Sequence, residues 1–348
     1  MNPNIQPRPA LRDGTGRIGG RIRTEEDVKL DTTLRPSDFN EFIGQAKIVS
    51  NLKIYIEAAK KRQEALDHII FSGSPGLGKT TLAYLVAKEL GSNIKVIQGP
   101  SLEKPADLAG ILTNMESRSV LFIDEIHRIP MVVSEYIYSA MEDFKLNIMI
   151  DQGPHARVVQ LNISPFTLIG ATTREGLLTD AFRSRFGIME KLETYPSDDL
   201  LKIIKRSCKL LGVDGSEEAL KIISQRSRGT PRIANQILKR IRDVAQVKAD
   251  NFISDKIVQE GLTMLGIDHY GLVPTDRKIL QTIIANGGGP IGLKTIAISV
   301  GEEEDTIEDV YEPYLIQCAF LEKTPRGRKA TKLAYEHLKH TPKDQNLF

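Results

Sequence analysis

The sequence predicts an α/β protein with a parallel β-sheet, followed by a small helical domain and a C-terminal winged helix. Three short runs, at residues 69–71, 120–123 and 166–169, are apolar and rich in branched side chains. Such runs are typical of central strands that are buried on both faces of a parallel sheet. After Pro196 the apolar residues recur with a helical period instead. The sheet is therefore expected first and the helical domain after it.

The stretches between these strands are expected to be helical crossovers. Residues 51–63, 80–90 and 131–141 have the length and pattern of such helices. A different pattern lies at 146–161, where alternating apolar residues flank Gly153-Pro154. This pattern predicts a hairpin, either a plain sheet edge or a protruding contact arm.

The C-terminal region has the element order of a winged helix. A helix from Asp276 ends at a glycine-proline run, a short and a longer helix follow, and a strand pair encloses residues 325–328. The predicted division is a mobile tail at 1–33, an α/β domain at 34–192, a helical domain at 193–263, a winged helix at 264–341 and a C-terminal tail at 342–348.

Composition indicates an ordinary globular chain of more than one domain. Of 348 residues, 41% are hydrophobic and 26% are charged. The length exceeds the roughly 100–200 residues of one domain. Because 47 basic residues face 45 acidic ones, the net charge is only +2, and any nucleic-acid site must be a local basic patch.

Signals for metal, disulfide, membrane or export are weak. Cys208 and Cys318 lie far apart without metal-ligand spacing, which argues against zinc and disulfides and favours a reducing cytoplasm. No apolar run approaches the ~18–20 residues of a membrane span, so no membrane partner is expected. The arginine-rich N-terminus lacks the apolar core of a secretory signal.

The strongest motif is a phosphate-binding loop at 73–80, which reads G-x-x-x-x-G-K-T. Gly76 and Gly78 let backbone N–H groups turn toward a phosphate, and the following helix directs its positive end at the same anion. Lys79 would reach the β- and γ-phosphates of ATP, and the Thr80 hydroxyl would ligate Mg²⁺. The strand before the loop and the helix after it argue against a chance glycine-rich turn.

Two adjacent carboxylates follow the second apolar strand. Asp124 is expected to hold the water shell of Mg²⁺, and Glu125 to polarise the water that attacks ATP. A GTPase would instead carry an N-K-x-D motif, which is absent. At the end of the third strand, Thr172 is a candidate sensor of the γ-phosphate, although alone it would mean little.

Two arginine sites suit phosphate because the guanidinium stays charged and donates through a planar fork. Arg185, close to Arg183, lies beyond the third strand, and Arg232 opens a helix of the small domain. An arginine supplied to a neighbouring subunit would couple hydrolysis to assembly. Ordinary surface arginines are the alternative for either site taken alone.

Basic residues cluster on and beside the predicted wing: Lys323, Arg326, Arg328, Lys329 and Lys332. Lys323, Arg326 and Arg328 would neutralise DNA phosphates with little sequence readout. A solvated basic face or a protein-docking wing is the alternative. His337 and His340 lie close together but lack a third ligand, and we interpret them as surface histidines.

Longer segments extend these motifs, and together they match one family. They are residues 34–36, 42–45, 76–81, 121–128, 140–143, 165–174, 228–235, 305–317 and 324–328. The chain resembles, over residues 34–341, the RuvB family of Holliday junction branch migration motors, which are AAA+ ATPases. The resemblance implies an AAA+ P-loop domain with a parallel sheet, a small helical lid and a winged-helix head.

The resemblance also implies roles for individual residues. Arg185 would be the finger that acts on a neighbouring subunit, Arg232 the sensor arginine of the lid and Thr172 the first sensor. The other residues implied to bind the nucleotide are Leu34, Arg35, Thr81, Glu142, Asp143, Phe144 and Tyr195. ATP or ADP with Mg²⁺ is the implied ligand set.

The implied partners are those of a recombination and repair motor. The family implies hexameric rings on duplex DNA at a junction held by a RuvA tetramer, with the RuvC resolvase. The 146–161 hairpin resembles the arm that docks on RuvA, with Val159 and Leu161 as candidate contacts. Glu304 and Lys323 occupy positions that are arginine in relatives, which weakens the DNA prediction.

Two other function classes fit part of the pattern. A nucleotide-switched regulator would read an operator with the winged helix, and footprinting would then protect one fixed sequence. A clamp-loader-like ATPase would need a sliding-clamp partner. The basic wing and the hairpin favour the motor over both.

Overall fold

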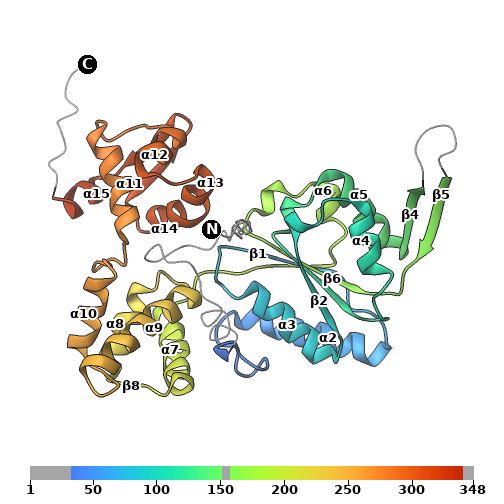
Figure 1. Ribbon diagram of the computed structural model, residues 1–348, viewed down its shortest axis with the longest axis horizontal. Helices are drawn as coiled ribbons and strands as arrows, with labels where there is room; N and C mark the ends of the chain where they lie inside the picture. Colours follow the sequence, from blue (N-terminus) through green and yellow to red (C-terminus); the bar gives the residue numbers. More distant parts are fainter. Residues whose placement is uncertain (1–32, 151–156, 340–348) are drawn as a thin grey trace, which may run out of the picture. The chain divides into compact units, whose positions relative to one another are not determined.

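The computed structural model describes residues 33–150 and 157–339 (Figure 1). The predicted tails at 1–33 and 342–348 therefore lie outside the described residues, except for Thr33. The chain divides into two compact units, one as far as Thr263 and one from Met264 onward, and each is described by itself. Across these described residues, no helix is long and apolar enough to cross a bilayer.

A five-stranded parallel sheet forms the centre of the first unit. Its order is β2-β3-β6-β1-β7. The strands are β1 (Ile69–Ser72), β2 (Ile94–Gln98), β3 (Val120–Asp124), β6 (Thr167–Thr172) and β7 (Ile188–Lys191). All residues of β1 and β6 are buried, which confirms the prediction of central strands from apolar runs. Because all pairs are parallel, the carboxyl ends of the strands share one edge.

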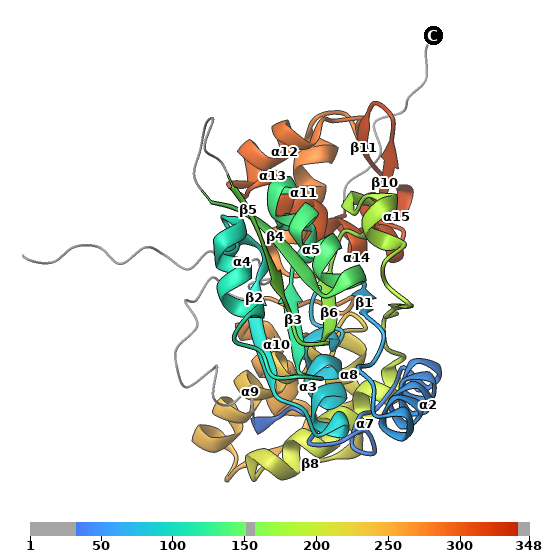
Figure 2. The same ribbon diagram turned by 90° about the vertical axis from the view of Figure 1, so that its right-hand side faces the viewer.

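Helices cover both faces of this sheet (Figures 1 and 2). One face carries α2 (Ala46–Arg62) and α3 (Lys79–Leu90), and the other carries α4 (Pro105–Leu112), α5 (Met131–Asp143) and α6 (Asp180–Arg183). The helices predicted at 80–90 and 131–141 are confirmed as connections between strands. The helix predicted at 51–63 is also present, but as α2 it precedes the first strand and is no crossover, and it begins five residues earlier than expected. Ile48 explains the difference, because this buried side chain extends the apolar face of the helix toward its start.

The predicted hairpin is confirmed. β4 (Lys145–Ile150) and β5 (Arg157–Asn162) pair antiparallel and project from the sheet (Figure 1). They form a separate two-stranded ribbon rather than an edge of the main sheet. This resolves the choice between a sheet edge and an arm in favour of the arm.

The lid is a bundle of four helices. They are α7 (Ser197–Leu211), α8 (Glu217–Arg226), α9 (Pro231–Lys248) and α10 (Asp255–Met264). α7 packs on α8 and α9, and the short parallel pair β8 (Asp214–Gly215) and β9 (Phe252–Ile253) closes the far end.

The second unit is a winged helix. Its helices are α11 (Pro274–Ala285), α12 (Leu293–Val300), α13 (Glu304–Thr306), η4 (Ile307–Tyr311), α14 (Glu312–Gln317) and α15 (Lys332–His337). The wing pairs β10 (Leu321–Thr324) with β11 (Gly327–Ala330). The single helix expected from Glu303 to Gln317 contains a π-helical turn, η4, before Pro313. Proline has no N–H to donate within a helix, and a widened turn accommodates that loss.

Candidate active site

The phosphate-binding loop lies where the sequence predicts it, between β1 and α3. Gly78 precedes the first turn of α3, which holds Lys79, Thr80 and Thr81. Gly76 has a φ of +84°, and a Cβ there would lie 2.8 Å from Thr230 Cγ2 and from Arg232 Cβ. Glycine is therefore required both by the left-handed backbone and by the close approach of the lid.

The Lys79 side chain folds back over its own loop. Its Nζ donates to the carbonyl oxygens of Gly73 at 2.6 Å and Ser74 at 3.0 Å. Burial lowers the pKa of Lys79 to about 8, although the negative charges of Glu125 and Asp124 oppose the shift. A buried ammonium whose hydrogen bonds go to neutral carbonyl groups is a favourable site for an anion.

The acidic pair, Asp124 and Glu125, lies at the carboxyl end of β3, and β6 separates this strand from β1. Asp124 Oδ1 accepts a hydrogen bond from the Glu125 backbone N–H at 3.1 Å. Glu125 itself has a left-handed φ of 50°, which turns the chain away from the strand. Burial, and then the charge of Asp124, raises the pKa of Glu125. A partly buried carboxylate with a raised pKa has the properties of a general base.

Both threonines at the end of β6 connect to this pair. Thr173 Oγ1 donates to Glu125 Oε2 at 3.2 Å. Thr172 is fully buried, and its Oγ1 lies 2.9 Å from His127 Nδ1. His127 Nδ1 is in turn 3.3 Å from Glu125 Oε2. Neither His127 nor Thr173 is among the predicted site residues. The one sequence signal for them is that each lies within two residues of a predicted site residue.

The lid contacts the loop closely. Tyr195 is buried, and its hydroxyl donates to the Leu77 carbonyl at 3.1 Å. Burial raises the pKa of Tyr195, so the phenol stays a donor. Arg232, in the first turn of α9, is close enough to repel Lys79 and reinforce the lowering of its pKa. Two predicted nucleotide residues of the lid therefore meet the loop.

Leu34 and Arg35, which are also implied to bind the nucleotide, lie beside the lid and the helix that follows the phosphate loop. Leu34 is buried, and its carbonyl accepts from Arg206 of α7 at 2.9 Å. The Arg35 guanidinium lies 5.5 Å from the ring centre of Tyr84 in α3. The first residues of the domain are thus bound to both the lid and the helix of the phosphate loop.

Arg185 and Glu142 belong to the opposite edge of the sheet. His68, just before β1, accepts a backbone hydrogen bond from Leu168 and lies 3.2 Å from the Met141 carbonyl, at the end of α5. Arg185 lies just before β7, whose first residue bonds to the His68 carbonyl. A four-residue strand spans about 13 Å. Arg185 and Glu142 therefore lie away from their own phosphate loop.

The two residues are joined to each other. Arg185 Nη2 lies 3.1 Å from Glu142 Oε1, and the guanidinium stacks 4.6 Å from the ring centre of Tyr138. Arg185 Nε is buried without a hydrogen-bond partner among the described residues. Of their predicted neighbours, Asp143 is exposed and Phe144 packs against Phe166 in the core.

The wing cations differ in their surroundings. Arg328 is 11% exposed, and its Nε donates to Glu312 at 2.5 Å. Lys323 Nζ lies 2.6 Å from Glu308 of η4. Arg326, at the turn of the wing, is exposed. Of the three predicted DNA contacts, Arg326 is the one that these ion pairs do not involve.

The expectation that His337 is a surface histidine is wrong. Its side chain is 7% exposed, and Nε2 lies 2.9 Å from Asp268 Oδ2. The ring packs against Tyr270 and Phe320, so α15 is held against the start of the unit. His340 lies outside the described residues.

One face of the hairpin is apolar, and it extends from the core of the domain toward the tip of the hairpin. Leu146 pairs with Leu161 and Ile148 with Val159, so these four side chains share one face. Leu146 is fully buried and Leu161 packs partly against the core, whereas Val159 is 37% exposed. Of the two predicted contacts, Val159 is the more accessible.

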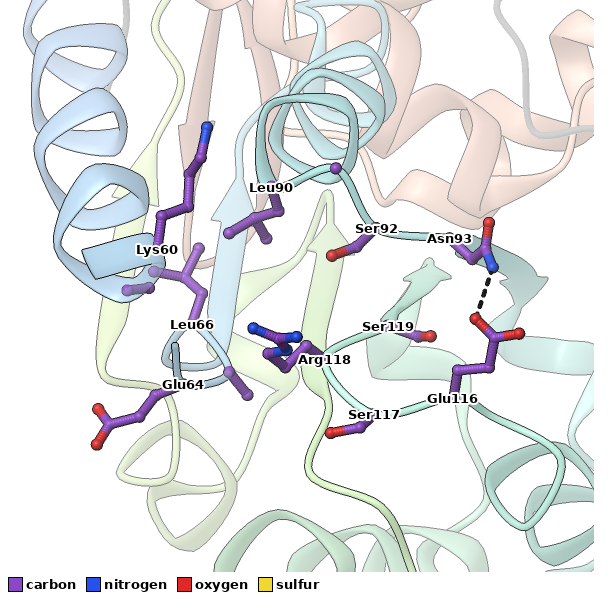
Figure 3. Close-up of a pocket in the computed structure, with 13 residues that line it drawn as sticks. Lys60, Glu64, Leu66, Leu90, Ser92, Asn93, Glu116, Ser117, Arg118 and Ser119 are labelled. Atoms are coloured by element: carbon purple, nitrogen blue, oxygen red, sulfur yellow. Dashed lines mark hydrogen bonds between the residues drawn. The ribbon is translucent and has the colours of Figure 1, made fainter. Parts of the chain in front are cut away.

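A cavity of about 170 Å³ lies at the amino edge of the sheet, far from the phosphate loop (Figure 3). Leu66 and Ser119, just before β1 and β3, line it together with Arg118 and Leu90. Asn93 donates to Glu116 across its rim at 3.0 Å. It contains none of the predicted site residues.

Three family models match the chain in sequence. Residues 34–192 match "Holliday junction DNA helicase RuvB P-loop domain", 195–268 match "RuvB AAA lid domain", and 269–339 match "RuvB C-terminal winged helix domain". A Holliday junction branch migration complex subunit RuvB of Myxococcus xanthus is 54% identical over 91% of this chain and 93% of its own length. This chain belongs to the RuvB family.

Further relatives agree with this assignment. The RuvB subunit of Flavobacterium psychrophilum is 54% identical over 90% of this chain and 92% of its own. The solved RuvB Holliday junction branch migration motor of Thermotoga maritima superposes with a TM-score of 0.82 at 49% identity, covering 89% of this chain and 99% of that one. Like the family, this chain is a P-loop ATPase motor subunit for branch migration.

Proposed function

We propose that the chain hydrolyses ATP between neighbouring subunits of a hexameric ring and uses that energy to move duplex DNA at Holliday junctions. The proposal rests chiefly on one observation. The phosphate loop with Glu125 lies at one edge of the sheet, and Arg185 lies at the other. A complete site then needs two subunits, as in ATPases whose arginine finger is supplied in trans.

In one subunit, the loop amides and Lys79 would bind the phosphates, and Arg232 would reach them from the lid. Glu125 would take a proton from the attacking water, because its raised pKa suits a base. Thr172 and Thr173 would sense the γ-phosphate, the latter through its hydrogen bond to Glu125.

Thr80 and Asp124 fit a Mg²⁺ ion that is shared with the nucleotide. Mg²⁺ prefers oxygen ligands and is usually held by one or two carboxylates together with phosphate oxygens and water. Within residues 33–150 and 157–339, no cluster of three His, Cys, Asp or Glu side chains could hold a metal without such help. When bound, the ion would neutralise charge on the phosphates.

Leu34, Arg35 and Tyr195 would enclose the adenine of the same subunit. Their contacts with α3, α7 and the loop support this assignment. Glu142, Asp143 and Phe144 lie at the far edge with Arg185, so they would face the nucleotide of the next subunit. There, Arg185 would leave Glu142 for the γ-phosphate.

The wing would contact DNA at phosphates. The helix that enters the major groove in many winged helices is acidic here, with Glu304, Asp305 and Glu308 on α13 and η4. Such a helix would be repelled by DNA phosphates. The exposed Arg326 of the wing is therefore the favoured contact, and this arrangement argues against an operator-reading regulator.

The β4-β5 hairpin would dock on RuvA. An apolar face that passes from the buried Leu146 to the exposed Val159 suits insertion into an apolar groove of a partner. RuvC would act at the same junction after migration.

We propose the reducing cytoplasm as the location of the protein. Cys208 and Cys318 are both free thiols, and Cys208 is buried, which fits a reducing compartment.

A synthetic four-way junction tests the proposal. With RuvA, ATP and Mg²⁺ present, the wild-type chain is expected to migrate the branch, and Glu125→Gln to bind ATP without migration. A matched mixture of Lys79→Met and Arg185→Ala subunits is expected to regain part of the hydrolysis rate, since some interfaces then combine an intact loop with an intact finger. Normal hydrolysis by pure Arg185→Ala rings would contradict the trans assignment.

A further inference from the structure

His127 occupies the centre of the connection between the acidic pair and the end of β6. Its side chain is 7% exposed, although it lies in a surface turn just beyond β3. A single ring nitrogen, Nδ1, approaches both Thr172 Oγ1 at 2.9 Å and Glu125 Oε2 at 3.3 Å. No assigned step of ATP hydrolysis uses this histidine.

The local backbone explains why the ring lies there. Glu125 adopts a left-handed conformation, and a 3₁₀ turn at Ile126–Arg128 follows, closed by a bond from Arg128 N–H to the Glu125 carbonyl at 2.9 Å. The Ile126 side chain fills the space beside Gly170 of β6, where a Cβ would lie only 2.8 Å away. The turn is thereby fixed against β6, and His127 faces Thr172.

We propose that His127 is a positioning residue for ATP hydrolysis, whose Nδ1 holds the Glu125 carboxylate in the orientation needed to activate water. The inference rests on the proposed role of Glu125 as the base. His127 and Thr173 both engage Oε2, and two contacts on one oxygen restrict rotation of the carboxylate. A base acts only within hydrogen-bond reach of its water, so a fixed orientation favours the reaction.

The same histidine links Glu125 to the phosphate loop. The Thr172 carbonyl accepts a hydrogen bond from the backbone N–H of Gly73, the first loop residue, at 3.2 Å. The Thr172 hydroxyl meets His127, which meets Glu125. A loop movement on nucleotide binding thus has a continuous route to the carboxylate, first through the backbone bond of Gly73 and then through the two contacts of His127 Nδ1, whose N–H can donate to both oxygens.

Isosteric substitutions separate this role from simple packing. His127→Asn places an amide nitrogen near the position of Nδ1, whereas His127→Gln places it near Nε2, and His127→Leu removes both. Hydrolysis by His127→Asn is expected within about threefold of wild type. His127→Gln and His127→Leu are expected to lose about tenfold to a hundredfold in kcat, the effect of one hydrogen bond to a charged group. The KM for ATP and the thermal midpoint should change little.

Equal kcat in all three variants and wild type would overturn the proposal, as would equal losses in Asn and Gln. A double variant then tests whether His127 acts through Glu125. In a Glu125→Gln background, His127→Leu is expected to add less than about twofold, whereas a separate structural role would give the full additional loss.

The single variant Glu125→Gln distinguishes failure of the proposed base, Glu125, from failure of the proposed role of His127. If Glu125→Gln alone hydrolyses ATP normally, the role of Glu125 as base is wrong and the inference about His127 fails with it. If Glu125→Gln is inactive but binds ATP, while His127→Leu turns over at the wild-type rate, only the role of His127 is wrong.

Discussion

The phosphate loop and the wing each contain a cation with little exposure to solvent, Lys79 and Arg328, but the partners of the two cations differ in charge. Lys79 donates to two carbonyl oxygens, and its pKa falls to about 8. Arg328 is paired with Glu312, whose hydrogen bond raises the pKa of the guanidinium. A cation held by neutral groups is available to an arriving phosphate, whereas a cation already neutralised by a carboxylate stabilises the fold. Burial and residue type alone do not separate the two roles.

The largest expected effect comes from removing the available cation. Lys79→Met is expected to lower ATP hydrolysis by roughly a hundredfold to a thousandfold, because a preorganised donor to developing phosphate charge is lost. Phosphate release measures the rate, and circular dichroism should show an unchanged fold. Lys79→Arg is the matched control for charge. An active Lys79→Met chain would remove the basis of the comparison.

Breaking the neutralised pair is expected to affect stability instead. Glu312 is 2% exposed, so Glu312→Gln leaves the Arg328 charge without its carboxylate and should cost about 3 kcal/mol of unfolding free energy. Urea melts of the full chain, followed in the winged helix, measure the loss. The double variant Arg328→Met with Glu312→Leu should recover most of it. An unchanged midpoint for Glu312→Gln, together with weaker DNA binding by the Arg328→Met variant, would instead make Arg328 a direct DNA contact.

Replacement of Arg326, the exposed cation of the wing, should instead weaken DNA binding and leave stability almost unchanged. Arg326→Ala is expected to weaken duplex binding about equally for all sequences and to reduce the salt slope by about one counterion. Stability should stay within about 0.5 kcal/mol, as is usual for an exposed substitution. Fluorescence anisotropy over a salt series provides both numbers. Lys256→Ala, which removes an exposed lysine of α10 outside the wing, is the control for the loss of one charge and should leave the salt slope unchanged.

His68 extends the comparison to a buried base that remains neutral. Burial lowers its pKa, so the unfolded chain takes up a proton that the folded chain does not. Stability should therefore fall as the pH drops below the ordinary histidine value of about 6.5, by at most about 1.4 kcal/mol per pH unit. Urea midpoints at pH 7.5 and 5.5 measure this dependence. His68→Gln should flatten it, and an unchanged slope in that variant would assign the effect to other groups.

Local sequence was sufficient for the fold class and for the phosphate loop. Apolar runs on both strand faces predicted β1, β3 and β6, because a central strand must be apolar on both sides. The glycines and the lysine of the loop belong to one continuous segment. Their chemistry can therefore be recognised without knowledge of any distant contact.

Pairings between distant segments could not be predicted in this way. His127 and Thr172 are 45 residues apart, and they meet because β3 and β6 are neighbours in the sheet. The pairing of Arg328 with Glu312 likewise depends on how the wing folds onto α14. In the sequence, Arg326 and Arg328 look alike, and only packing distinguishes an exposed charge from a neutralised one.

The fold class, the identity of the phosphate loop and the family follow from the amino-acid sequence, because hydrophobic period and contiguous motifs are local properties of the chain. The separation of Arg185 from its own loop, the contacts of His127 and the fate of each wing cation arise only on folding. They depend on which strands become neighbours and on which charges lose water, and neither is encoded within a single short segment.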